Sequence, residues 1–312
     1  MPGFAATNNT VSGVAAQVDG VFLFITLVGL FFFVLTQGFL IYFALRYRRK
    51  KREEPAETPY ITGSHWLETL WVVIPSLVVL AIFIYGYLVY RTIRTPPADA
   101  VEIQVTARQW LYQFTYPDGR TAVNEVRVEV GRPVKFLMKS ADVIHGLYLP
   151  DFRVKMDILP GSYTYLWVQP EQVGKYEIYC TEYCGTGHSV MRAVMIVMNH
   201  EDYGRWVKQE EKPETLSLTK KGEKLTENSG CLACHSLDGT ARVGPTLKGL
   251  FGKKVALADG KSVVADETYI RESILEPNAK LVQGFPPVMP TFQGVLKDED
   301  ITAIIAYIKT VK

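Results

Sequence analysis

Two cysteines, a histidine and a methionine share one short segment, CTEYCGTGHSVM at residues 180–191. The side chains with soft ligand atoms are Cys180, Cys184, His188 and Met191. The cysteine spacing differs from the C-x-x-C of zinc motifs. Among the five histidines of the sequence, His145 lies upstream in SADVIHGLYLP, where we expect the start of a strand or a turn. Together these residues offer two thiolates, two imidazoles and a thioether.

This donor set favours a copper centre. Thiolate and thioether ligands select copper, zinc or iron–sulfur clusters, and imidazole suits copper and zinc. A methionine ligand argues against structural zinc, and a mononuclear blue-copper site uses one cysteine rather than two. Two bridging cysteines with two histidines can hold two copper ions, an arrangement suited to electron transfer. The alternative is a Cys180–Cys184 disulfide beside a surface histidine, which leaves Met191 and His145 without a role.

A second pair of cysteines stands in CLACH, residues 231–235. C-x-x-C-H is the attachment motif of c-type haem, so Cys231 and Cys234 would bind the porphyrin and His235 would be the proximal ligand. Met289, in the Pro-rich segment PPVMPTF, is the only methionine after Met198 and is the candidate sixth ligand. Methionine–histidine ligation raises a haem potential. The alternatives are a redox-active disulfide and simple loop packing of the methionine.

Two apolar runs near the N-terminus predict membrane spans. Residues 21–45 and 69–90 contain no charged side chain. Each run is long enough to cross a bilayer, so we expect membrane spans over about 21–45 and 67–90. A signal peptide or buried core helices are the alternatives. The basic run RYRRKKR (46–52) predicts a cytoplasmic loop with both termini outside. Glu68, at the start of the second span, is either a wet interfacial carboxylate or a proton-entry group.

The rest of the chain changes from strand patterns to helical ones. Alternating apolar and polar residues such as VEIQV and VRVEV predict a β-sandwich or barrel. Later strands are expected at 163–168, 173–179 and 191–198. A charged stretch containing proline predicts a linker, and beyond it helical periodicity places Ile301, Ile304, Ile305 and Ile308 on one stripe. The formal net charge of +2 gives no case for a nucleic-acid partner.

Several motifs resemble known families. WLETLWVVIP, RQWLYQF, HGLYLPDFRVKMDILPG and YCTEYCGTGHSVM resemble subunit II of the haem–copper cytochrome c oxidases, over roughly residues 15–200. GPTLKGLFGKK and the last helix resemble class I bacterial cytochromes c, over roughly 218–312. The resemblance implies a multidomain fold: a two-helix transmembrane hairpin, an all-β cupredoxin-like Greek-key barrel with a dinuclear CuA centre, and an all-α class I cytochrome c domain. The expected boundaries are 1–94, 95–200, 201–217 as linker, and 218–312.

The resemblance also assigns ligand roles. Cys180 and Cys184 would bridge the two coppers. His145 and His188 would each bind one copper, and Met191 would be a weak ligand to one of them.

Three further residues match functional positions of the family. The Glu182 carbonyl would bind the second copper, and its carboxylate would reach magnesium at the subunit I interface. Trp110 matches the tryptophan where electrons enter, with barrel packing as the alternative. Glu68 matches the carboxylate at the mouth of a proton channel into subunit I.

The implied function is electron transfer in a terminal oxidase of the caa type. Electrons would pass from an external donor, such as a cytochrome c or another respiratory complex, through haem c to CuA and then to subunit I. That partner would reduce oxygen to water, coupled to proton translocation. The chain would lie in the bacterial cytoplasmic membrane, in contact with lipid, with its redox domains on the outer side. The alternatives are a nitric oxide reductase CuA subunit, a copper-handling assembly factor and a quinol-oxidase subunit.

Overall fold

The structure is a computed structural model and describes residues 11–48, 60, 62–209 and 217–312. The chain divides into two units, Met1–Thr95 and Pro96–Lys312.

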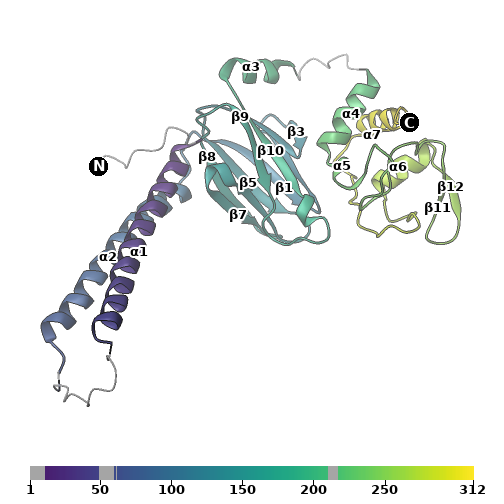
Figure 1. Ribbon diagram of the computed structural model, residues 1–312. Helices are drawn as coiled ribbons and strands as arrows, with labels where there is room; N and C mark the ends of the chain where they lie inside the picture. The colour runs from purple at the N-terminus through teal and green to yellow at the C-terminus, as the bar shows by residue number, and fades with distance from the viewer. Residues whose placement is uncertain (1–10, 49–59, 61, 210–216) are drawn as a thin grey trace. The chain divides into compact units, whose positions relative to one another are not determined.

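The first unit is a hairpin of two long helices, α1 (Gly13–Arg46) and α2 (His65–Arg94) (Figure 1). Ser12 caps α1 by accepting the Ala15 N–H at 3.1 Å. The helices contact each other where the Phe24 and Tyr85 rings meet edge to face, with centroids 5.8 Å apart. Both helices are long and apolar enough to cross a membrane, and both expected spans lie within them.

The apolar side chains of this hairpin point outward. Phe22, Phe31 and Leu45 are largely exposed, and only three residues of the two helices are buried. A helix that is apolar on all sides is stable in lipid or against another apolar surface rather than in water. The pattern therefore favours a membrane anchor over the buried core of a soluble protein.

The second unit begins with a sandwich of two five-stranded sheets, ordered β3-β2-β1-β5-β8 and β4-β10-β9-β6-β7 (Figure 1). The first sheet comprises β1 (Val101–Arg108), β2 (Leu111–Thr115), β3 (Thr121–Val123), β5 (Val134–Ser140) and β8 (Thr164–Val168). The second comprises β4 (Glu125–Glu129), β6 (His145–Leu149), β7 (Val154–Ile158), β9 (Gly174–Tyr179) and β10 (Arg192–Met198). Two single turns of 3-10 helix, η1 (Pro150–Phe152) and η2 (His188–Val190), interrupt the loops.

Alternation along the strands builds the core between the sheets. Every second residue of β10 is buried, and β1 behaves in the same way over its second half. Phe114 and Phe136 are fully buried and meet edge to face at 6.2 Å. The pairs β1/β5 and β4/β10 are parallel and the other strand pairs are antiparallel. The three later strands lie within one residue of their expected positions.

The segment expected to be a linker begins with a helix, α3 (His200–Gln209). Its charge and the nearby proline suggested a connection without structure, but Trp206 anchors it to the sandwich. The Trp206 ring lies 5.4 Å from the Tyr116 ring, and the guanidinium carbon of Arg120 lies 4.5 Å above it. A cation over a tryptophan face is attracted to it, and burial of the indole adds to the contact. The expected linker therefore has a folded first half, and residues 210–216 lie outside the described residues.

The C-terminal part is mostly helical. Its helices are α4 (Leu218–Asn228), α5 (Cys231–Cys234), α6 (Glu267–Leu275) and α7 (Asp298–Ile308), and β11 (Lys254–Ala256) pairs with β12 (Ser262–Val264). The four isoleucines of the predicted stripe on α7 are buried, which confirms it. Helix α4 crosses α7 at Gly222, where a Cβ would lie only 1.9 Å from the Ala303 carbonyl oxygen. Glycine is required there because the two backbones touch.

Candidate metal centre and haem pocket

The candidate metal centre lies at one end of three neighbouring strands. In the second sheet β10, β9 and β6 are adjacent, and β9 is antiparallel to both neighbours. The start of β6, the end of β9 and the start of β10 therefore share one edge. His145 begins β6, Cys180 follows β9, and Met191 directly precedes β10. This topology brings a histidine 35 residues upstream to the cysteine loop.

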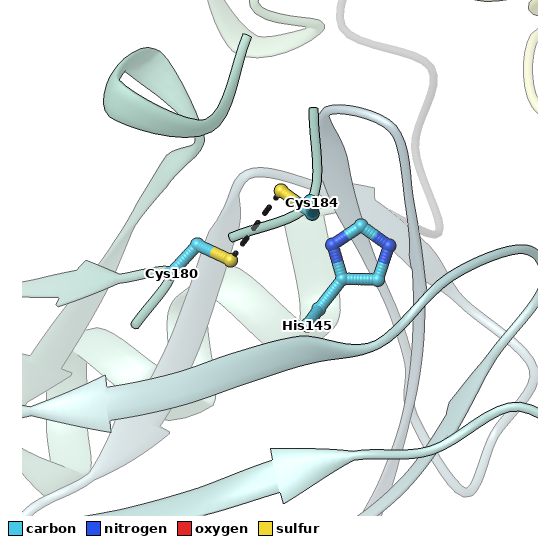
Figure 2. Close-up of side chains that lie close together, drawn as sticks. All are labelled: His145, Cys180 and Cys184. Carbon is cyan, nitrogen blue, oxygen red and sulfur yellow. Dashed lines mark hydrogen bonds between the residues drawn. The ribbon is translucent and has the colours of Figure 1, made fainter. Parts of the chain in front are cut away.

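His145, Cys180 and Cys184 converge in a buried cluster (Figure 2). Their ligand atoms all lie within 4.8 Å of one another, and the two cysteine sulfurs are 3.7 Å apart. The cysteines are free thiols in this geometry, and His145 is fully buried. The two cysteines form no disulfide, and the three buried donor atoms are close enough together to hold a metal ion.

The other three predicted ligands flank this cluster. His188 Nδ1 lies 3.6 Å from Cys184 Sγ, and Met191 Sδ lies 3.8 Å from the same sulfur. The Glu182 carbonyl oxygen lies 3.3 Å from Cys180 Sγ. The structure thus brings all six predicted donor groups together, and their ligation of copper stays a prediction.

A carboxylate that the sequence reasoning missed orients His145. The imidazole Nε2 lies 2.8 Å from Asp142 Oδ1, and the Gln109 N–H donates to Asp142 Oδ2 at 2.7 Å. The other ring nitrogen, Nδ1, is buried without a hydrogen-bond partner among the described residues. A buried polar atom without a partner is costly, whereas a metal ion would satisfy its lone pair. An acid three residues before a ligand histidine is the sequence signal that could have found Asp142.

These contacts shift the ionisation of both partners. Burial raises the pKa of Asp142, but the hydrogen bonds from the Gln109 N–H and from His145 outweigh it, so the net pKa is lowered. Burial lowers the pKa of His145, but the Cys180 sulfur and the Asp142 carboxylate outweigh it, so the net pKa is raised.

The surroundings shift the pKa values of the two thiols in opposite directions. Burial raises the pKa of Cys180, yet contacts with His145 and with the N–H groups of Gly146 and Glu182 lower it overall. Burial raises the pKa of Cys184, and the negative charge on Cys180 raises it further. Without metal, the site therefore favours one thiolate and one thiol, and a cation between the sulfurs would draw the second proton off.

Trp110 packs directly on the cysteine loop. Its indole N–H donates to the Cys184 carbonyl at 3.1 Å, and the Gln109 side-chain amide donates to the same oxygen at 2.7 Å. A Cβ at Gly187 would lie 2.4 Å from the indole ring, and Gly185 has φ of +112°. A Cβ at Gly185 would also crowd the indole, at 3.1 Å from Cζ2. Both glycines thus let the ring approach the loop, where its N–H hydrogen-bonds to a predicted ligand residue.

Glu182 and Glu68 lie in other surroundings. The Glu182 carboxylate accepts a hydrogen bond from Lys155 Nζ at 2.9 Å, which lowers the pKa of Glu182. An ammonium group beside it competes with a magnesium ion for the same oxygens. Glu68 lies in the first turn of α2, half exposed, with His65 Nδ1 at 3.7 Å.

The CLACH motif lines a cavity of about 530 Å³ in the C-terminal part. Cys231, Cys234, His235 and Met289 all contribute to its wall. The His235 Nδ1–H donates to the Pro245 carbonyl at 2.6 Å, which leaves the opposite ring nitrogen available as a ligand. Burial lowers the pKa of His235 and raises those of both cysteines. A neutral imidazole beside two thiols in an apolar cavity suits a covalently attached haem.

The chain combines two long apolar helices, a β-sandwich with a buried cluster of two cysteines and a histidine, and a helical part whose cavity is lined by CLACH. These features together indicate a membrane-anchored electron-transfer protein. Comparison with known families agrees. The chain matches the models for the transmembrane domain of cytochrome c oxidase subunit II over residues 5–89, its periplasmic domain over 120–198, and cytochrome c over 219–312.

Two individual relatives give the same result. The cytochrome c oxidase subunit 2 of Alkalihalophilus pseudofirmus is 31% identical, over 94% of this chain and 86% of the relative. The alternative cytochrome c oxidase subunit 2 of Bradyrhizobium diazoefficiens is 31% identical, over 64% of this chain and 82% of the relative. The solved periplasmic domain of subunit II of cytochrome oxidase from Bradyrhizobium japonicum is 27% identical, over 38% of this chain and 98% of that domain, with a TM-score of 0.36.

The chain therefore belongs to the cytochrome c oxidase subunit II family. It is an electron-transfer subunit of a haem–copper terminal oxidase, and its two redox domains imply copper and haem c. The fused cytochrome c domain fits the caa type. These findings do not favour the nitric oxide reductase subunit or the assembly factor.

Proposed function

We propose that this chain passes electrons from an external donor through haem c at Cys231 and Cys234 to a dinuclear CuA centre, and on to subunit I. The observation that carries the proposal is the buried, unpaired Nδ1 of His145 beside two free thiols 3.7 Å apart. His145, Cys180, Cys184, His188 and Met191 would hold the copper, which would supply one-electron transfer with little rearrangement of its surroundings.

The chain's own residues would hold this centre in a fixed geometry. Asp142 keeps the His145 ring oriented through Nε2, which leaves Nδ1 for the metal. Gln109 and Trp110 hold the Cys184 carbonyl from outside the loop. Because the Trp110 ring is half-buried and reaches a ligand residue through one hydrogen bond, it is the proposed entry point for electrons.

We place the redox domains on the outer side of a bacterial cytoplasmic membrane. The support is the basic run at 46–52, of which residues 49–52 lie outside the described residues. We assign the hairpin to 1–94, the copper domain to 95–200 and the cytochrome to 218–312, with α3 as a structured start of the link. Glu68, at the inner end of α2, is the proposed proton entry into subunit I. Magnesium at Glu182 would require displacement of Lys155 and further ligands from subunit I.

The test is the optical spectrum and metal content of the purified chain loaded with copper(II). We expect a c-type haem band, a near-infrared band of a copper–thiolate centre and two coppers per chain. A haem band without the near-infrared band would refute the CuA assignment. A matched pair of variants sharpens the result: His145→Ala should abolish the near-infrared band, whereas substitution of the exposed His200, His200→Ala, should leave it unchanged.

The sixth haem ligand has a separate test. Met289→Ala should lower the haem midpoint potential, because thioether ligation favours the reduced iron. An unchanged potential would assign the sixth position to another residue. Oxygen consumption by the purified complex, measured against nitric oxide consumption, decides the identity of the catalytic partner.

A further inference from the structure

Tyr112 joins the two sheets directly behind the candidate copper site. It lies on β2 in the first sheet and is fully buried. Its hydroxyl donates to the carbonyl of Gly146 at 2.5 Å. Gly146 lies on β6 of the second sheet, immediately after His145. A single side chain from one sheet therefore fixes the backbone next to a predicted ligand of the other.

Gly146 also touches the cysteine loop. Its N–H donates to the Cys180 sulfur. A Cβ at this position would lie 2.4 Å from Thr181 Oγ1 and 3.0 Å from the Thr181 nitrogen. The strand and the loop thus meet backbone to backbone, and a small displacement of Gly146 would move its N–H away from the sulfur.

The phenol itself lies beside the same sulfur. Burial raises the pKa of Tyr112, and the charge on the neighbouring Cys180 raises it further. The hydroxyl has a single proton, and the Gly146 carbonyl accepts it. The phenol therefore acts on Cys180 through the Gly146 backbone.

We propose that Tyr112 is a positioning residue of the copper centre: its hydroxyl holds Gly146 and supports the hydrogen bonding to Cys180 that raises the reduction potential of the centre. Donors to a metal-bound sulfur withdraw electron density and favour the reduced state, so partners outside the ligand set tune a metal's potential. The inference rests on the proposed copper function.

The chain offers a matched control in Tyr116. This tyrosine is also buried, and its hydroxyl also reaches the second sheet, where it accepts the Arg127 N–H at 2.7 Å. Arg127 lies on β4, which carries none of the predicted ligands. Tyr112→Phe and Tyr116→Phe each remove one buried hydroxyl with backbone partners, so their effects on stability should be similar.

The experiment compares both variants with the unaltered full chain loaded with copper(II). Redox titration followed at the near-infrared band gives the midpoint potential, and electron paramagnetic resonance gives the copper hyperfine coupling. Tyr112→Phe should lower the potential and change the coupling, whereas Tyr116→Phe should change neither. Equal potentials and spectra in the two variants would overturn the proposal. An unaltered chain that lacks the near-infrared band would instead refute the copper function itself.

A second substitution covers the case in which Tyr112→Phe does not fold. Site-specific replacement of Tyr112 by 3-fluorotyrosine keeps the size of the ring and makes the hydroxyl a stronger donor. The midpoint potential should rise, opposite in sign to the change in Tyr112→Phe. An unchanged potential in the fluorinated protein would contradict the role of the hydroxyl.

Discussion

Gly187→Ala is the most direct test of the contact between Trp110 and the cysteine loop. The added Cβ would lie 2.4 Å from Cδ2 and 2.7 Å from Cε3 of the indole. Carbon atoms in contact are about 3.5–4.0 Å apart, so the ring must retreat by roughly 1 Å. Gly187 has φ of −86° and ψ of 10°, outside the left-handed region that favours glycine. The effect of the substitution is therefore steric rather than conformational.

The retreat also costs a hydrogen bond. The Trp110 Nε1 to Cys184 oxygen distance is 3.1 Å, so about 1 Å more takes it beyond hydrogen-bonding range. Overpacking costs about 1–3 kcal/mol and the lost hydrogen bond about 1 kcal/mol. Alanine also reduces the entropy of the unfolded chain, which returns about 0.4–1 kcal/mol. We expect the free energy of unfolding to fall by about 1–3 kcal/mol. In a domain of this size, each kcal/mol lowers the melting temperature by roughly 4 °C.

The assay is thermal unfolding followed by tryptophan fluorescence, together with the rate of electron transfer from reduced haem c to copper. The variant should melt earlier and transfer more slowly. Gly204→Ala is the control, since Gly204 lies inside α3 and an added Cβ there would have no atom within 4 Å. That substitution should raise stability by about 0.5–1 kcal/mol. If Gly187→Ala behaves like the control, Trp110 does not pack on this loop as described.

Two further predictions concern acid stability and the helix crossing. Folding lowers the pKa of Asp142 below its ordinary 3.8, so this carboxylate stabilises the fold above that pH and the contribution is lost as pH falls through the folded value. Asp142→Asn should therefore flatten the fall in melting temperature of the copper-free chain as the pH drops below about 5. Parallel acid slopes in the two proteins would contradict this account. Gly222→Ala places a Cβ 1.9 Å from the Ala303 carbonyl, where neither backbone can give way, and should cost about 3 kcal/mol or more. Thermal unfolding followed at the haem band measures this loss. A melting temperature within about 2 °C of the unaltered chain would contradict the close contact of the two helices, because 2 °C corresponds to only about half a kcal/mol.

The parts of the fold that sequence alone could predict are those encoded by short-range pattern. Period-two alternation placed three strands within a residue, because each strand buries one face. The spacing in CTEYCGTGHSVM and CLACH marked both sites, since one loop carries most of the side chains of each. His145 could be found because the sequence has only five histidines and few alternatives remained.

The groups that position those side chains could not be predicted in the same way. Tyr112 and Gly187 lie within RQWLYQF and CTEYCGTGHSVM, but no spacing rule marks their roles, which depend on which strands become neighbours. For Asp142 the only sequence signal is its place three residues before His145. Helix α3 was missed because its charge pattern suggests a solvated segment, whereas its stability comes from Trp206 packing on the sandwich. Tertiary contacts of this kind override local pattern, and only the folded structure reveals them.

The segment around Trp110, the proposed entry point for electrons, also fixes the position of the predicted copper ligands. Three residues between β1 and the first half of β2 donate hydrogen bonds to backbone carbonyls beside predicted ligands: Gln109 and Trp110 to Cys184, and Tyr112 to Gly146. A metal that exchanges electrons rapidly needs ligands held in one geometry by surrounding hydrogen bonds and packing. Slower transfer in a Trp110 variant would therefore have two explanations, loss of a route for electrons and displacement of Cys184. An unchanged near-infrared band and hyperfine coupling in that variant would assign the loss to the route, whereas altered spectra would assign it to the position of the ligand.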